Sequence, residues 1–149
     1  MNRFYKHLIL TIFIIFVGFF AYKYFSIKQT TYGDVVSELL KNDETVKRID
    51  IAISTYNEGT VTRKTAIISN NDIINRLLNE PAKMELMTHD RLPIIEYWLT
   101  FYTDTAKKKG FDIIMGDGFA IIGKEQYRIS GDNKLAETIE NLDIDWEPK

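Results

Sequence analysis

The chain contains no cysteine, and this absence removes several classes of structure and chemistry at once. Disulfide bridges, thiol catalysis, cysteine-ligated metal sites and anchoring through a lipidated cysteine are all excluded. Histidine is scarce, and His89 is the only one outside the N-terminal segment. The stretch from Met87 to Asp90 is typical of an exposed loop, and no nucleophile motif accompanies it. We therefore expect no catalytic residue, no cofactor and no metal site.

Acidic residues are missing from the first 33 positions, so all 21 of them lie between Asp34 and Glu147. The part of the chain that follows the N-terminal segment is therefore net acidic. Nucleic acids are recognised by clustered Lys and Arg that displace counterions, so nucleic acid is not expected as a partner. A domain with this many carboxylates brings some of them together by chance. A hydrolase that uses two carboxylates is kept as an alternative function.

Charge is also missing from residues 8–22, which form an apolar run rich in Ile and Phe. A membrane-spanning helix needs about 17–25 mostly apolar residues, and aromatic residues at both ends extend this run over 5–25. The sequence predicts a transmembrane signal-anchor helix that contacts the lipid bilayer through residues 5–25. A cleaved signal peptide and a buried helix are the alternatives, and the residues around Ala21 and Ser26 form a poor cleavage site. Basic residues flank the run on both sides: Arg3, Lys6, Lys23 and Lys28.

The position of this run predicts the domain organisation and the location of the protein. Residues 1–29 are expected to form a cytoplasmic stub and the anchor helix, and residues 30–149 a single extracytoplasmic α+β domain. The short basic flank before the run favours a cytoplasmic N-terminus. The expectation is a single-pass protein of the cell membrane with its C-terminal domain outside the cell.

Hydrophobic periodicity and turn residues predict the elements of the domain. We expect an α+β fold, an antiparallel sheet of about five to seven strands with two or three helices on one face, preceded by the one N-terminal transmembrane helix. Helices are predicted over 32–41, from Ser69 to Asn79 and over 133–142. Strands are predicted over 46–54, 61–68, 83–88, 94–103, 111–115, 119–122 and 126–130.

Polar residues mark where these elements begin and end. Thr31 is expected to cap the first helix and Asp132 the third helix. Ser69 is expected to cap the second helix, through a capping box that Asp72 completes. A hairpin tip is expected over 57–59, where a glycine supplies a positive φ. The tail over 143–149 is acidic and expected to be frayed, with Trp146 packing back onto the domain.

The strand predicted over 94–103 is rich in aromatic and β-branched residues on both of its faces. This composition predicts a central strand of the sheet. Tyr97 is expected on one face, and Trp98 and Tyr102 on the other. If helices leave one face uncovered, these three aromatic residues form a candidate ligand face for a peptide, a lipid or a sugar polymer. The alternative is that they are core residues or cross-strand pairs.

Three local motifs resemble a family of small, functionally uncharacterised extracytoplasmic proteins of low-GC Gram-positive bacteria. A strand that ends Thr-Ala-Ile-Ile-Ser at 65–69 enters a helix, Pro93 precedes the strand with Tyr97, and Gln-Tyr-Arg-Ile at 126–129 precedes the last helix. The resemblance covers residues 46–142. It implies an extracytoplasmic location, with an N-terminal helix as the anchor because this chain has no cysteine for a lipid. It implies no activity and no functional residues.

The function expected from the sequence is a membrane-tethered, extracytoplasmic binding or accessory domain without catalytic activity. The expected partners are an envelope protein or a secreted peptide. The alternatives are an envelope enzyme and a structural subunit of a membrane complex.

Overall fold

The computed structural model describes residues 9–19, 28–40, 44–104 and 110–148. Residues 9–19 are helical. The chain then continues through β1 (Gln29–Thr31), α2 (Tyr32–Leu39), β2 (Val46–Asn57), β3 (Thr60–Ile68), α3 (Asn71–Asn79), β4 (Glu85–Thr88), β5 (Tyr97–Thr103), β6 (Phe111–Gly116), β7 (Phe119–Ile122), β8 (Glu125–Ser130), α4 (Lys134–Glu140) and β9 (Glu147–Pro148).

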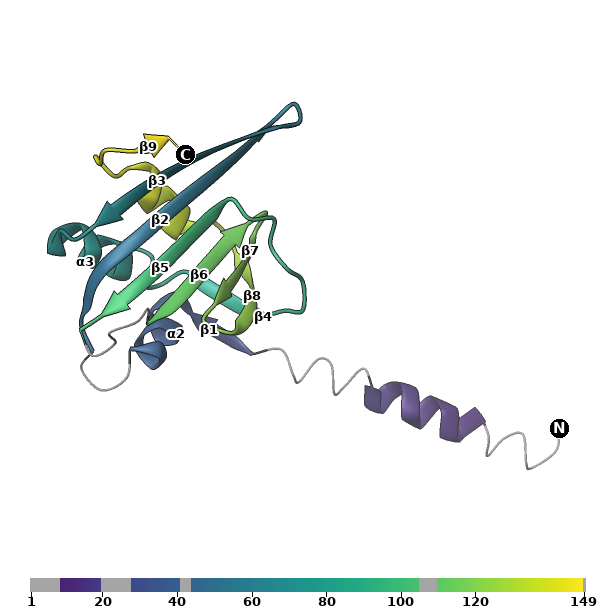
Figure 1. The fold of residues 1–149 in the computed structure, drawn as a ribbon. Helices are drawn as coiled ribbons and strands as arrows, with labels where there is room; N and C mark the ends of the chain where they lie inside the picture. The colour runs from purple at the N-terminus through teal and green to yellow at the C-terminus, as the bar shows by residue number, and fades with distance from the viewer. Residues whose placement is uncertain (1–8, 20–27, 41–43, 105–109, 149) are drawn as a thin grey trace.

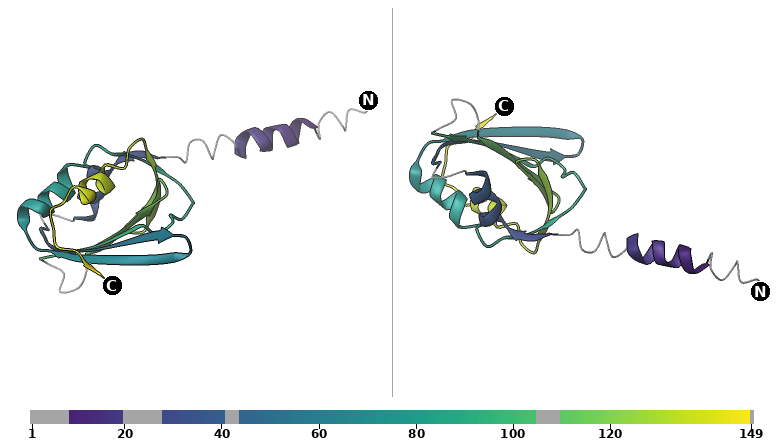
Figure 2. Two further views of the ribbon diagram at one scale, coloured as in Figure 1. Left: turned by 90° about the horizontal axis from the view of Figure 1, so that it is seen from above. Right: turned by 90° about the horizontal axis from the view of Figure 1, so that it is seen from below.

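All nine strands belong to one antiparallel sheet, in the order β1-β4-β8-β7-β6-β5-β2-β3-β9. The sheet curves around the three helices α2, α3 and α4, which lie inside the curve (Figure 2). The opposite, outer face of the sheet carries none of the described helices. The hairpin of β2 and β3 reaches beyond the neighbouring strands at one end (Figure 1).

The core lies between the inner face of the sheet and the helices. Residues that alternate along a strand point to the same face, and the inner positions of the central strands are almost entirely shielded from solvent. Phe101 and Phe111 stack there with ring centroids 4.5 Å apart. The fully buried side chains include Tyr32, Ile49, Ile51, Leu77, Leu86, Leu99, Phe101, Ile113, Met115, Ile122, Leu135 and Ile139.

Two tight turns explain why consecutive strands pair as hairpins. Glu58 and Gly59 join β2 to β3 with φ values of 43° and 83°, and Asp117 and Gly118 join β6 to β7 with φ values of 51° and 73°. Two consecutive positive φ angles define the turn whose twist matches that of paired strands. The expected hairpin tip over 57–59 is confirmed by this geometry.

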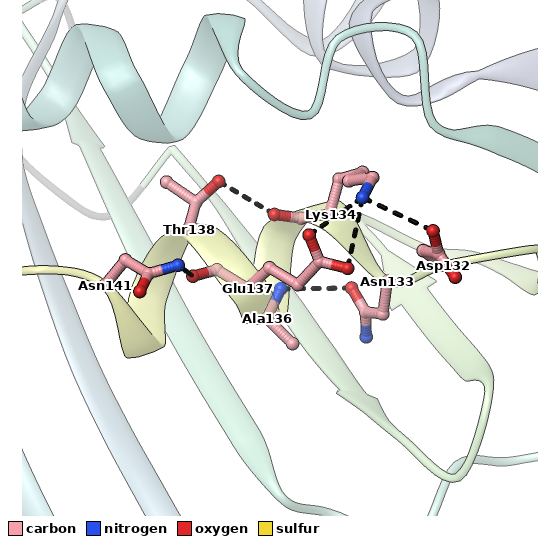
Figure 3. Close-up of polar contacts among 7 residues, drawn as sticks. All are labelled: Asp132, Asn133, Lys134, Ala136, Glu137, Thr138 and Asn141. Carbon is pink, nitrogen blue, oxygen red and sulfur yellow. Dashed lines mark hydrogen bonds and ion pairs between the residues drawn. The ribbon is translucent and has the colours of Figure 1, made fainter.

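Side-chain hydrogen bonds and ion pairs among residues 132–141 stabilise the short helix α4 from within (Figure 3). Asn133 accepts a hydrogen bond of 3.1 Å from the backbone N–H of Ala136 and so caps the helix. The ammonium nitrogen of Lys134 lies 2.8 Å from Glu137 Oε2 and 3.4 Å from Asp132 Oδ2. These exposed pairs contribute little to stability individually, but together they fix the first turn of a helix that is too short to be stable alone.

The predicted fold class is wrong in the size of the sheet, which has nine strands rather than five to seven. The two strands missed by the sequence analysis, β1 and β9, are its two edges. They span three and two residues, too few for a period-two pattern to be recognised. Tail residues 147–148, expected to be frayed, pair with β3.

The predicted transmembrane signal-anchor helix is also contradicted. Among the residues described, no helix has both the length and the apolar character needed to cross a membrane. The helix over 9–19 extends about 16 Å at 1.5 Å per residue, roughly half of a hydrocarbon core. The remaining positions of the predicted segment, 5–8 and 20–25, lie outside the described residues. The single-pass membrane location inferred from that helix is corrected accordingly.

The helix caps differ from the predictions by one residue at two of three helices. Thr31 caps α2, as predicted, by accepting a hydrogen bond from the backbone N–H of Asp34. At α3 the cap is Asn70 rather than Ser69, with its side-chain oxygen 2.8 Å from the backbone nitrogen of Asp72. At α4 the cap is Asn133 rather than Asp132. Runs of adjacent Ser, Asn and Asp offer several equivalent caps, so the sequence cannot select one of them.

Candidate functional site

The outer face of the sheet carries a row of apolar side chains that crosses four adjacent strands. The strand registers place Ala52 of β2, Trp98 of β5, Ile114 of β6 and Ile121 of β7 directly opposite one another, and we call these four residues the apolar band. Residues directly opposite in antiparallel strands share a face. Thr65 of β3 and Gln126 of β8 continue the row at its two ends.

Solvent reaches this band, in contrast to the inner face. Trp98 is 39% exposed to solvent, whereas its neighbour Leu99, which points inward, is fully buried. Ala52, Ile114 and Ile121 are half-buried. Ile67 on β3 lies one row away from the band on the same face and is 71% exposed. Contiguous exposed apolar side chains on a sheet face mark interaction surfaces more often than chance.

A shallow hollow of about 330 Å³ lies at the β3 end of the apolar band. Trp98 and Ala52 form part of its lining, together with Thr65, Ile67 and Arg63 of β3. Asp50 and Thr100 complete the polar part of the lining. The hollow therefore combines an aromatic ring, aliphatic side chains and one charge of each sign, which suits a ligand with both apolar and polar groups.

Arg48 contacts both the carboxyl group of Asp50 and the ring of Tyr102 on this face. Its Nε lies 2.9 Å from Asp50 Oδ1, and its Nη2 donates a hydrogen bond of 3.2 Å to Asp50 Oδ2. The guanidinium also lies 4.0 Å from the centre of the Tyr102 ring. Tyr102 is on the same face as Trp98, but this cation–π contact covers its ring. Of the three predicted ligand residues, Trp98 is thus the most available.

Tyr97 lies on the opposite side of the sheet from Trp98. Its hydroxyl donates a hydrogen bond of 2.5 Å to Glu140, at the end of α4. Desolvation by burial, followed by the hydrogen bond to Glu140 and the negative charge of that residue, raises the pKa of the Tyr97 hydroxyl above its ordinary value. The structure therefore brings together Trp98 and Tyr102 but not Tyr97, whose contact holds α4 against the sheet.

The loop between β4 and β5 closes the outer face at its other end. The guanidinium of Arg91 lies 4.6 Å from the ring centre of Phe119 and pairs with Asp117 at 2.9 Å. The His89 ring lies 5.1 Å from the same phenyl ring. A Cβ atom on Gly116 would approach the carbonyl oxygen of Ile94 to 1.9 Å, so only glycine allows the loop this close. The open part of the face is therefore limited to the apolar band and its flanks.

Most residues of this surface were not identified from the sequence as candidates. Ala52, Ile67, Ile114 and Ile121 belong to strands whose inner residues are also apolar, and a strand that is apolar on both faces is read first as fully buried. A usable signal is present, however, in the consecutive apolar residues at 66–68, 113–115 and 120–122. In a sheet with helices on one side only, such runs leave apolar side chains on the other side.

The ionisable side chains that the structure describes do not gather at one site as the residues of the apolar band do. Within the described ranges, no group of three His, Asp or Glu side chains is placed to hold a metal ion. Hydrogen bonds from Thr45 lower the pKa of Asp104, and a hydrogen bond from Arg76 lowers the pKa of Glu80. Both carboxyl groups lie at the surface, and a lowered pKa is opposite to what a general acid requires.

Comparisons with known proteins place no further constraint on this surface. No protein-family model matches the chain, and no curated protein or solved structure matches it either. The resemblance to a family of extracytoplasmic proteins stays a prediction.

Proposed function

We propose that this protein is a non-catalytic binding or accessory domain that engages a protein partner through the outer face of its sheet. The observation that carries the proposal is the apolar band, with a partly exposed tryptophan at its centre and no described helix covering it. Burying such a band against a partner removes apolar surface from water.

The composition of the face supports a protein partner. Interfaces between proteins place aromatic and aliphatic residues centrally and polar or charged residues at the rim. Here Trp98 is central, and Arg63, Asp50 and Arg48 lie on the flanks. Trp and Arg are also the residue types that most often dominate the binding free energy of an interface.

The carboxylate-based hydrolase is the weaker proposal. A glycosidase of that kind needs two facing carboxyl groups, one of which has a raised pKa. Among the described residues, the carboxyl groups whose pKa is clearly displaced are those of Asp104 and Glu80; both pKa values are lowered, and each group is held by its own hydrogen bonds. These shifts favour a structural role for both residues.

Site-specific photo-crosslinking in the cells that make the protein tests the proposed surface. A benzophenone amino acid replaces Gln126, at the end of the row, and in a separate chain it replaces Asn75, an exposed residue of α3 on the helix side. We expect irradiation to give one discrete crosslinked species from position 126 and none from position 75.

Two results would contradict the proposal. One is the recovery of only uncrosslinked protein from position 126, and the other is the same set of crosslinked species from both positions. Normal far-ultraviolet circular dichroism of both substituted chains is the control for folding.

A further inference from the structure

The C-terminal strand β9 covers only a small part of the edge of the sheet. It pairs with Lys64 and Thr65, whereas β3 extends from Thr60 to Ile68. Both residues of β9 are exposed. An incompletely covered edge strand presents backbone N–H and C=O groups that can pair with a further strand. Among the described residues, β9 is therefore a short occupant of this edge that pairs with two residues of β3.

The segment that leads into β9 alternates acidic and apolar residues, in the order Asp-Ile-Asp-Trp-Glu over 143–147. Alternation with a period of two places the apolar side chains on one face of an extended segment. Ile144 and Trp146 are packed against the hydrophobic core, and the Lys64 ammonium lies 4.5 Å from the centre of the Trp146 ring. Ile144 and Trp146 thus face the core next to this edge, and Glu147 and Pro148 pair with β3.

Basic residues and a hollow lie at the same edge. Arg63 and Lys64 are adjacent on β3, and their positive charge is opposite in sign to that of the acidic tail. A hollow of about 290 Å³ is lined by Thr55, Thr62, Arg63 and Lys64 together with Trp146 and Pro148. It lies along the continuation of β9, where β3 extends toward the free end of its hairpin (Figure 1). A longer strand on this edge would extend into the hollow.

We propose that the edge of β3 is a strand-addition site for an extended peptide of a partner protein that alternates acidic and apolar residues. In this arrangement β9 is a resident occupant that the peptide displaces. Backbone hydrogen bonds supply affinity in strand addition, and side-chain pockets supply selectivity. Here Lys64 and the hollow select apolar or aromatic side chains on one face of the added strand, and Arg63, which points to the other face of β3, selects acidic ones. This edge adjoins the proposed outer-face site, and Arg63 lines both hollows, whereas Trp98 lines the outer-face hollow and not the edge hollow.

Fluorescence anisotropy with a labelled peptide tests this site on the full chain. The probe is Asp-Ile-Asp-Phe-Glu-Pro, and the matched control peptide has the same composition with its three acidic residues placed together. Trp146→Ala weakens the resident strand. We expect this variant to bind the probe at least about tenfold more tightly than the unmodified chain does, because less of the edge is then occupied.

Charge reversal at the edge provides the second arm. The double variant Arg63→Glu/Lys64→Glu is expected to weaken binding of the probe by at least about tenfold. The matched variant Lys83→Glu/Lys124→Glu, which changes net charge equally at distant exposed positions, is expected to leave it within about twofold. If the reversed variant does not fold, Arg63→Gln/Lys64→Gln is measured in its place.

Several outcomes would overturn the inference. These are no binding of the probe to either chain, equal binding by the unmodified chain and the Trp146→Ala variant, or equal binding of the probe and the control peptide. Dimerisation of the full chain by exchange of its tail would replace the separate partner with a second copy. The variant Trp98→Glu is expected to bind the probe normally, so failure at the edge and failure at the outer face are separate results.

Discussion

The two faces of strand β5 have similar composition but different roles. Leu99 and Phe101 point inward and are fully buried, whereas Trp98 points outward and is partly exposed. Both sets of side chains are bulky and apolar, so hydrophobicity alone does not distinguish them. The difference comes from the helices, which lie inside the curve of the sheet and leave its outer face open (Figure 2). Apolar residues therefore stabilise the fold on one face and are available for binding on the other.

The largest expected effect comes from truncation on the inner face. Leu99→Ala removes a fully buried side chain from the centre of the core, and such changes cost about 2–5 kcal/mol in unfolding free energy. Urea denaturation monitored by circular dichroism measures the loss. A loss below about 1 kcal/mol would show that the two faces do not differ as described.

High pH weakens the inner face specifically. Burial raises the pKa of the Tyr32 hydroxyl well above its ordinary value. The unfolded chain ionises this group near pH 10, so its contribution to stability is complete below that pH and is lost as the pH rises further. The loss is about 1.4 kcal/mol per pH unit for one such group.

Urea denaturation at intervals between pH 8 and pH 11 is the measurement. Tyr32→Phe removes the ionisable hydroxyl, which also donates a hydrogen bond of 3.2 Å to the carbonyl of Leu77. The variant is expected to be less stable at neutral pH but to lose stability less steeply above pH 10. Equal slopes for the two chains would argue against the buried position of this tyrosine.

A smaller effect is expected where the inner face meets α4. Tyr97→Phe removes the hydrogen bond to Glu140, which is worth about 0.5–1.5 kcal/mol. A double-mutant cycle with Glu140→Ala, which removes the acceptor oxygen, isolates the contribution of the pair. Additive losses in this cycle would mean that the contact does not hold α4 to the sheet.

The smallest effect on stability is expected on the outer face. Trp98→Ala removes the largest side chain of the apolar band, but Trp98 is 39% exposed, so a smaller share of it is buried than of the inward-pointing Leu99. We expect the free energy of unfolding to fall by about 1 kcal/mol or less. A loss as large as that of Leu99→Ala would identify Trp98 as a structural residue.

Sequence reasoning located the elements of the inner layer well and the edges and surface poorly. The strands from β2 to β8 and the helices α2, α3 and α4 overlap the predicted ranges, because their alternation and turn residues are local signals. The edge strands β1 and β9 are formed by pairing with distant segments, which leaves no local pattern. The apolar run over 8–22 predicts a membrane-spanning helix, but the described helix within it is too short to cross a membrane.

The candidate site was predictable only in part, for the same reason. The aromatic strand identified Trp98 and placed Tyr102 beside it, but the cation–π contact of Arg48 depends on the three-dimensional arrangement. The apolar band requires knowledge of strand register, which brings Ala52, Ile114 and Ile121 into line with Trp98. Register across four strands is a property of the folded sheet rather than of any one segment.

One paired measurement tests most directly whether the outer face exists for binding rather than for stability. Trp98→Glu is introduced into the chain that carries the photo-crosslinker at position 126, and both crosslinking and the urea midpoint are recorded. The account predicts that the crosslinked species disappears while the midpoint stays close to that of the parent chain. A crosslink that persists, or one that is lost only because the midpoint collapses, would contradict it.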